Sequence, residues 1–181
     1  MAEKLICDRL VEIIDPTSYR SGALEYGASE FWIHENHLLS YEENNWRVLC
    51  LQPKEERFIE LRLYRRLCKL IDCERDPANS IDGFLETTNV PEIKIFMIKQ
   101  SDLPSKVLAG FSPERWGTEL ICVEYPNSFE RQESEKIIFG KGFKHLESVS
   151  VSDVYIKVDR DNQDLEIPAL EQEQPRNIFE V

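Results

Sequence analysis

The stretch that decides the fold is residues 118–158, which read TELICVEYPNSFERQESEKIIFGKGFKHLESVSVSDVYIKV. It opens on the apolar run Thr118–Tyr125, which predicts a strand that ends at Pro126. Ser128 is a suitable N-cap for a helix over Phe129–Phe139. Ser148–Val158 then alternates apolar and polar side chains, as a strand does. This stretch therefore predicts a strand–helix–strand unit.

Two features close that unit and refine it. Gly140 and Gly142 can end the helix in the left-handed conformation that glycine adopts at low cost. The alternation of the last strand breaks at Ser152-Asp153, which indicates either a bulge or a turn.

Working outward from this unit, the remaining segments carry weaker signals. Apolar residues at the helical period predict a helix that Asp15-Pro16 ends, and two glycines mark a loop after it. Trp46, Val48 and Cys50 lie in a run that is apolar on both faces, which is typical of an interior strand. The expected segments are a helix at Glu3–Ile14, a loop at Thr17–Ala28, β structure at Ser29–Gln52, a charged loop at Cys73–Asn79, a strand at Ile93–Ile98 and a short helix at Leu103–Gly110.

Residues 55–72 allow two assignments. In the first, Pro53–Glu56 is a hairpin loop, Ile59–Leu63 alternates as a strand, and the chain becomes helical near Tyr64. In the second, Glu55–Asp72 forms one long helix, which its Leu, Arg, Glu and Lys content favours.

Together these elements predict an α+β fold. Residues 1–158 are expected to form a single globular domain, with a mixed, largely antiparallel sheet packed against two to four helices. Residues 159–181 contain seven acidic and two basic side chains and no apolar period, so we expect a disordered acidic C-terminal tail. Its short apolar clusters resemble peptides that fold on binding, and the residues expected to contact a partner are Ile167, Leu170, Ile178, Phe179 and Val181.

The composition limits the compartment and the partners. The net charge is −12, so an overall attraction to nucleic acid is excluded unless a local basic patch supplies it. The five cysteines form no CxxC pair and lie mostly in apolar runs, which is typical of buried thiols in a cytoplasmic or nuclear protein. The first residues lack a secretory signal, and no apolar run is long enough to span a membrane, so no membrane partner is expected.

One group of residues resembles a known catalytic signature. Asp82, followed by Glu92 and Lys94 at the start of a strong strand, is similar to the motif of the PD-(D/E)xK nuclease superfamily. The resemblance implies that the two carboxylates would hold a divalent metal and that the lysine would orient a water nucleophile. The alternative is a solvated strand edge in which Lys94 limits aggregation.

The only concentrated positive charge lies at Arg62, Arg65, Arg66 and Lys69. On a helix these residues would form one stripe that could hold an acidic protein segment or phosphates. Trp116 follows Pro113 and precedes Gly117, so it is expected in a loop, where it could anchor an interface or pack in the core.

No other motif points to chemistry. Glycine-rich phosphate loops and nucleophile motifs are absent, and the histidine and cysteine spacings do not fit zinc, so the sequence predicts no cofactor and no metal. The leading hypothesis is a non-enzymatic regulatory or adaptor subunit that binds other proteins. The alternatives are the metal-dependent nuclease and a nucleic-acid-associated subunit that uses the basic stripe.

Overall fold

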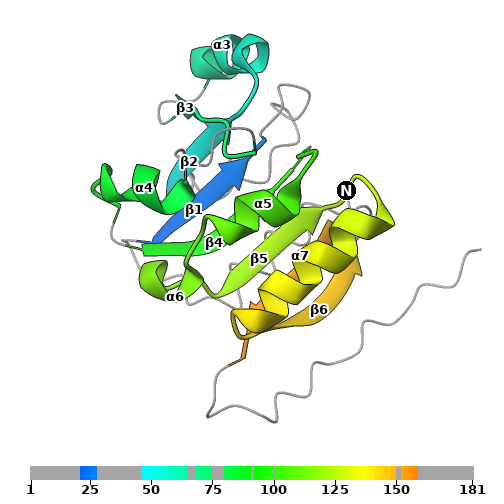
Figure 1. The fold of residues 1–181 in the computed structure, drawn as a ribbon. Helices are drawn as coiled ribbons and strands as arrows, with labels where there is room; N and C mark the ends of the chain where they lie inside the picture. The colour runs from blue at the N-terminus through cyan, green and yellow to red at the C-terminus, as the bar shows by residue number, and fades with distance from the viewer. Residues whose placement is uncertain are drawn as a thin grey trace, which may run out of the picture.

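The structure is a computed structural model that describes residues 21–27, 46–64, 68–74, 80–90, 92–99, 101–149 and 152–158. Its strands form one seven-stranded sheet in the order β3-β2-β1-β4-β5-β7-β6 (Figure 1). The strands are β1 (Ser21–Tyr26), β2 (Arg47–Gln52), β3 (Cys68–Leu70), β4 (Glu92–Ile98), β5 (Leu120–Glu124), β6 (Phe143–Val149) and β7 (Ser152–Lys157). The helices are α3 (Glu55–Tyr64), α4 (Ile81–Glu86), α5 (Pro104–Ala109), α6 (Pro113–Trp116) and α7 (Ser128–Gly140).

The sheet is mixed, as predicted, but the expectation of a largely antiparallel α+β sheet is wrong. The strands β3, β2, β1, β4 and β5 run parallel to one another, while β7 is antiparallel to both β5 and β6. Parallel neighbours need a crossover connection, and the helices α3 to α6 lie in those connections. The fold therefore belongs to the α/β class.

The central strand β1 occupies a segment that the sequence predicts to be a loop. Ala23, Leu24 and Tyr26 are fully buried, because β1 pairs with β2 on one side and β4 on the other. Gly22 stands in this strand because a Cβ there would come within 2.8 Å of the Glu92 carbonyl oxygen. This glycine therefore marks a close backbone approach inside the sheet and not a turn.

The ambiguous stretch after β2 contains a helix and then a strand. Helix α3 ends at Tyr64, and β3 begins at Cys68 and pairs with β2. Neither assignment is right as a whole, because the helix begins as the second assignment requires but stops well before Asp72. Helix α4 was not predicted; its N-cap is Ser80, whose hydroxyl accepts a hydrogen bond from the Gly83 N–H.

The first strand and the helix of the predicted strand–helix–strand unit are confirmed, but two antiparallel strands, β6 and β7, follow the helix in place of one. Strands β4 and β5 and helices α5 and α7 lie where the apolar patterns place them. The N-cap of α7 is Asn127 and not Ser128, because the Asn127 side chain accepts a hydrogen bond from the Glu130 N–H. The expected bulge or turn at Ser152-Asp153 is wrong, because both residues belong to β7 and pair with β6, which ends at Val149. The predicted helix Glu3–Ile14 and most of the β structure before Trp46 lie outside the described residues.

The sheet has an apolar core on each face. Helices α4, α5, α6 and α7 pack on the first face (Figure 1). On this face Phe96 of the sheet meets Phe111, with ring centroids 4.5 Å apart. The second face carries a smaller buried cluster of Ala23, Trp46, Val48, Cys50, Ile95, Met97, Leu120, Cys122 and Val154. None of the described helices is long and apolar enough to cross a lipid bilayer.

Candidate functional site

The carboxyl ends of the parallel strands meet at one edge of the sheet, and the sheet order places a crevice there. Strand β1 has β2 on one side and β4 on the other, so the connections from β1 and β4 diverge. Ligands in open α/β sheets bind outside the carboxyl ends of the strands at such a point. Gly27 leaves β1 at this edge with φ 78°, a conformation that glycine adopts without strain. Residues 28–45, which follow it, lie outside the described residues.

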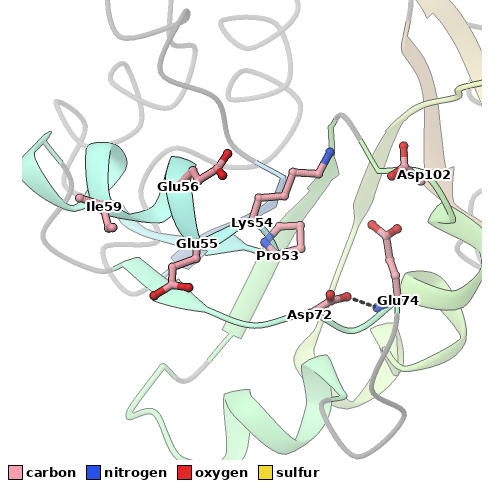
Figure 2. A pocket seen from close by; sticks show the side chains of 8 residues that line it. All are labelled: Pro53, Lys54, Glu55, Glu56, Ile59, Asp72, Glu74 and Asp102. Atoms are coloured by element: carbon pink, nitrogen blue, oxygen red, sulfur yellow. Dashed lines mark hydrogen bonds between the residues drawn. The ribbon is translucent and has the colours of Figure 1, made fainter.

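A cavity of about 540 Å³ opens at the same edge. Its size is within the range of small-molecule and cofactor sites. It is lined by Pro53, Lys54, Glu55, Glu56, Ile59, Asp72, Glu74 and Asp102 (Figure 2). Five of these eight side chains are carboxylates and one is a lysine, so the cavity favours a ligand with positive charge and disfavours phosphates.

Backbone and side-chain hydrogen bonds fix the walls of this cavity. The Gln52 side chain accepts a hydrogen bond from the Lys54 N–H at 3.0 Å, which shapes the turn after β2. Asp72 accepts from the Glu74 N–H at 3.1 Å, as Figure 2 shows. The buried Ser101 hydroxyl donates to the Glu74 carboxylate at 2.9 Å, which ties the segment after β3 to the segment after β4. The walls are therefore held by contacts between different strand ends.

Two buried titratable groups lie beneath the acidic wall. Burial raises the pKa of the Tyr26 hydroxyl well above its ordinary value, and the nearby charges of Glu74, Cys73 and Asp72 raise it further. Burial, together with Asp72 and Glu74, also raises the pKa of the Cys73 thiol from 9.0 to about 12. Both groups are therefore neutral at physiological pH, and the charge of this region comes from the carboxylates at its surface.

A buried ion pair lies at the carboxyl ends of β1 and β4. The Glu25 carboxylate of β1 lies 4.0 Å from the Lys99 ammonium group, which follows β4, and both side chains are at most 10 % exposed. The Lys99 N–H also donates to the Tyr26 carbonyl at 2.8 Å. These contacts join β1 to β4 at the point where their connections separate.

A second, smaller cavity of about 320 Å³ adjoins the first and shares Lys54 and Asp102 with it. Its lining is Lys54, Arg57, Ser101, Asp102, Glu124, Tyr125 and Pro126, so it reaches from the end of β4 to the end of β5. The Tyr125 hydroxyl is 2.9 Å from the Tyr155 hydroxyl. Burial and this hydrogen bond raise the pKa of Tyr125 far above its ordinary value. Two adjoining polar cavities of this kind can hold two reactants side by side.

The three residues of the nuclease resemblance do not form a metal site. The Asp82 carboxylate accepts hydrogen bonds from the Ser112 N–H at 3.0 Å and from the Trp116 indole N–H at 2.7 Å. Lys94 pairs with Glu119 at 2.6 Å and with Glu92 at 3.5 Å, at the amino ends of β4 and β5. Within the described part of the chain, no three His, Cys, Asp or Glu side chains are grouped to hold a metal. The nuclease hypothesis is therefore wrong.

The predicted partner-binding residues are dispersed. Arg62 is exposed on α3 and Lys69 is exposed on β3, so the proposed stripe does not lie on one helix. Trp116 ends the short helix α6, where it is 8 % exposed and packs in the first core, so it does not lie in an exposed loop. Arg65, Arg66 and the tail residues 159–181 lie outside the described residues. Binding of a protein partner by these residues stays a prediction.

The residues that do come together, namely those of the two cavities, were not predicted from the sequence. They follow strands at their carboxyl ends, but neither β1 nor β3 was predicted, so the edge could not be assembled. The available signal was the short segment Ala23–Tyr26, which is apolar except at Glu25, followed by a single glycine. A lone glycine is a weak signal without the strand before it.

No protein-family model matches the sequence, and no curated protein matches it. Solved structures do share its fold, which is the α/β fold of methyltransferases. The SAM-dependent O-methyltransferase from Thermotoga maritima superposes with a TM-score of 0.56 at 12% identity, over 86% of this chain and 66% of that one. The fibrillarin pre-rRNA processing protein from Methanococcus jannaschii gives 0.52 at 13% identity, over 76% and 67%. The CurJ carbon methyltransferase gives 0.51 at 12% identity, over 84% and 52%. The chain thus spans between half and two thirds of the length of these structures.

This likeness overturns the functional hypotheses drawn from the sequence. The leading hypothesis was a non-enzymatic adaptor or regulatory subunit, and the alternatives were a nuclease and a nucleic-acid-associated subunit. The sheet is instead that of methyltransferases, which are enzymes. The adaptor hypothesis depended on the view that charged side chains are scattered for solvation. The acidic cavity at the strand ends contradicts that view, because it gathers five carboxylates in one place.

Proposed function

We propose that this chain is a methyltransferase that uses S-adenosylmethionine. The observation that supports the proposal most is the acidic cavity at the carboxyl ends of β2, β3 and β4 in a sheet of methyltransferase order. This proposal replaces the expectation that the protein uses no cofactor.

The residues present fit this cofactor on three counts. S-adenosylmethionine carries a sulfonium and an ammonium group against one carboxylate, so its net positive charge suits a cavity lined by five carboxylates. The same carboxylates would repel the phosphates of a dinucleotide, which is the other ligand common at such an edge. The 540 Å³ cavity is also large enough for a nucleoside with a short side chain.

Individual residues can be given roles in holding the cofactor. Asp72 and Glu74 would accept hydrogen bonds from ribose hydroxyls or from the ammonium group, since a carboxylate offers about four acceptor positions. Ile59 is 60% exposed beside these carboxylates and would cover the apolar face of the base. Ser101 would orient the Glu74 carboxylate through the 2.9 Å hydrogen bond. When bound, the cofactor supplies an electrophilic methyl group.

The acceptor would occupy the second cavity. Asp102 and Lys54 line both cavities, so they lie where the two reactants would meet. Figure 2 shows both among the residues that line the first cavity. Asp102 or Glu124 would accept the proton that an amine or hydroxyl acceptor loses as it is methylated. Tyr125, which stays neutral, would contribute its ring to the wall of the cavity.

We also infer that the protein works in the cytoplasm or nucleus. Of the cysteines that the structure describes, Cys50, Cys68, Cys73 and Cys122 form no disulfide. Such thiols are typical of a reducing compartment.

Isothermal titration of the full chain with S-adenosylhomocysteine, the stable product of the cofactor, tests the proposal. We expect saturable binding that Asp72→Asn weakens about 10- to 100-fold, because a hydrogen bond to a charged group contributes about 1.5–3 kcal/mol. Glu114→Gln is the matched control, since Glu114 is an exposed carboxylate on α6 away from the cavity. Absence of heat and of saturation at millimolar ligand would show that the cavity does not hold this cofactor.

A further inference from the structure

The charges of the second cavity are separated according to the elements that carry them. Lys54 and Arg57 come from the segment after β2 and from α3, whereas Asp102 follows β4 and Glu124 ends β5. In the sheet β1 and β4 lie between β2 and β5, so the two cations line one side of the cavity and the two carboxylates line the other. The first cavity has a large excess of carboxylates, so the two cavities favour ligands of different charge.

The protein already satisfies the two hydroxyl groups in this lining. The Ser101 hydroxyl donates to a carboxylate of the first cavity at 2.9 Å. Tyr155 donates to Glu135 of α7 at 3.3 Å, so the 2.9 Å hydrogen bond between the Tyr125 and Tyr155 hydroxyls has Tyr125 as its donor. A ligand therefore meets the ring of Tyr125 and the apolar ring of Pro126, together with the charged side chains.

Lys54 and Asp102 are the two charged residues that can bind this ligand directly. Among the described residues, neither the Lys54 ammonium group nor the Asp102 carboxylate forms an ion pair, whereas Arg57 and Glu124 have other contacts. Figure 2 shows the Lys54 side chain extending toward the side of the cavity where Asp102 lies. A cation and a carboxylate that face one small cavity without pairing are complementary to a ligand that carries both charges.

We propose that the second cavity binds a small molecule that carries a carboxylate at one end and an amine at the other. Its volume of about 320 Å³ lies at the lower end of the range for ligand pockets, about 300–1,000 Å³, so the ligand is small. The ligand carboxylate would pair with Lys54 and the amine would face Asp102. The body of the ligand would lie against the ring of Tyr125.

If the proposed function holds, on which this step rests, the amine is the group that is methylated. Asp102 lines both cavities, so an amine that faces it lies beside the methyl donor. The nitrogen lone pair forms the new nitrogen–carbon bond as the carbon–sulfur bond breaks, and the electron pair of that bond stays on sulfur. Asp102 accepts the proton that the nitrogen loses. The products are the methylated amine and S-adenosylhomocysteine.

Three matched probes test the ligand class when their binding to the full chain is titrated by NMR. The probe 4-(aminomethyl)benzoate carries both groups on one ring, benzylamine lacks the carboxylate, and 4-methylbenzoate lacks the amine. We expect the first probe to bind about 5-fold more tightly than either of the others, because an exposed charge pair contributes up to about 1 kcal/mol. Equal dissociation constants for all three probes, or no binding of any probe at millimolar concentration, would overturn the proposal.

Variants assign the two charge pairs to residues. Lys54→Gln should weaken the binding of 4-(aminomethyl)benzoate about 5-fold and leave that of benzylamine unchanged, because only the first probe has a carboxylate. Asp102→Asn should weaken benzylamine and leave 4-methylbenzoate unchanged. The control is Lys136→Gln, which removes an exposed lysine of α7 that lines neither cavity and should change no probe. An equal loss of both amine probes in Lys54→Gln would contradict the proposal.

The ligand class and the proposed function fail separately in this experiment. Each titration is made with the chain alone and with the chain in millimolar S-adenosylhomocysteine. If S-adenosylhomocysteine binds but the probes bind equally, the ligand class is wrong and the proposed function stands. If the probes differ as expected but S-adenosylhomocysteine does not bind, the ligand class is supported and methyl transfer is not.

Discussion

Replacing Asp82 by alanine should destabilise the protein, because this carboxylate holds the connection between β4 and β5 together. Its Oδ1 atom accepts from the Trp116 indole N–H at 2.7 Å and from the Ser112 N–H at 3.0 Å. Hydrogen bonds to a charged group contribute about 1.5–3 kcal/mol each. Asp82 is only half-buried, so we take the lower end for both bonds and expect a loss of about 3 kcal/mol.

The matched variant Asp82→Asn separates the hydrogen bonds from the charge. Asparagine keeps an acceptor oxygen at the same place, so we expect Asp82→Asn to lose about 1 kcal/mol. Glu86→Ala, on the same helix, removes a surface ion pair with Arg115 at 2.6 Å and should cost less than about 1 kcal/mol.

Urea unfolding followed by tryptophan fluorescence measures all three variants. The midpoint should fall most for Asp82→Ala, with an unchanged dependence on urea concentration. An alanine variant as stable as the wild-type chain, or an asparagine variant as damaged as the alanine one, would refute the reasoning. A catalytic metal ligand would behave in the opposite way, since its removal usually leaves stability intact or raises it.

Two further predictions concern close packing and pH. Gly22→Ala should destabilise the protein by about 2 kcal/mol, because its Cβ would meet the Glu92 carbonyl oxygen. Gly140→Ala should stabilise it by about 0.5 kcal/mol, because no atom lies within 4 Å of a Cβ at that position. Thermal melts measure both changes. The free energy of unfolding should fall as pH rises from 9 towards 12, because the unfolded Cys73 thiol ionises at its ordinary value while the folded one stays protonated until about 12. The free energy of unfolding of the Cys73→Ala variant should fall less steeply between pH 9 and 10 than that of the wild-type chain. Equal slopes in both chains would show that this thiol does not titrate as described.

The sequence predicted well those elements whose apolar pattern is long and uninterrupted. Strands β4 and β5 and helix α7 were found, because Ile93–Ile98, Thr118–Tyr125 and Phe129–Phe139 carry clear periods. Their order alone leaves the direction of the strands open. The antiparallel expectation failed because helix α4 and strand β3, which lie in the crossovers, are too short to produce a period.

The candidate site could not be predicted for a related reason. Its side chains follow four different strands, and they come together only when the sheet order is known. Gly22 and Gly27 indicate a loop in the sequence, although the first serves close packing and the second ends the central strand. Asp72 and Asp102 are isolated aspartates in a chain with 34 acidic residues, so nothing local distinguishes them from solvated side chains.

The most direct test of the central claim is the backbone amide NMR spectrum of the full labelled chain during titration with S-adenosylhomocysteine. If the cavity at the carboxyl edge holds the cofactor, the amides that shift should cluster in residues 54–56, 72–74 and 101–102. Shifts gathered instead at the amino edge around Lys94 and Glu119, or a spectrum unchanged at millimolar ligand, would contradict the account.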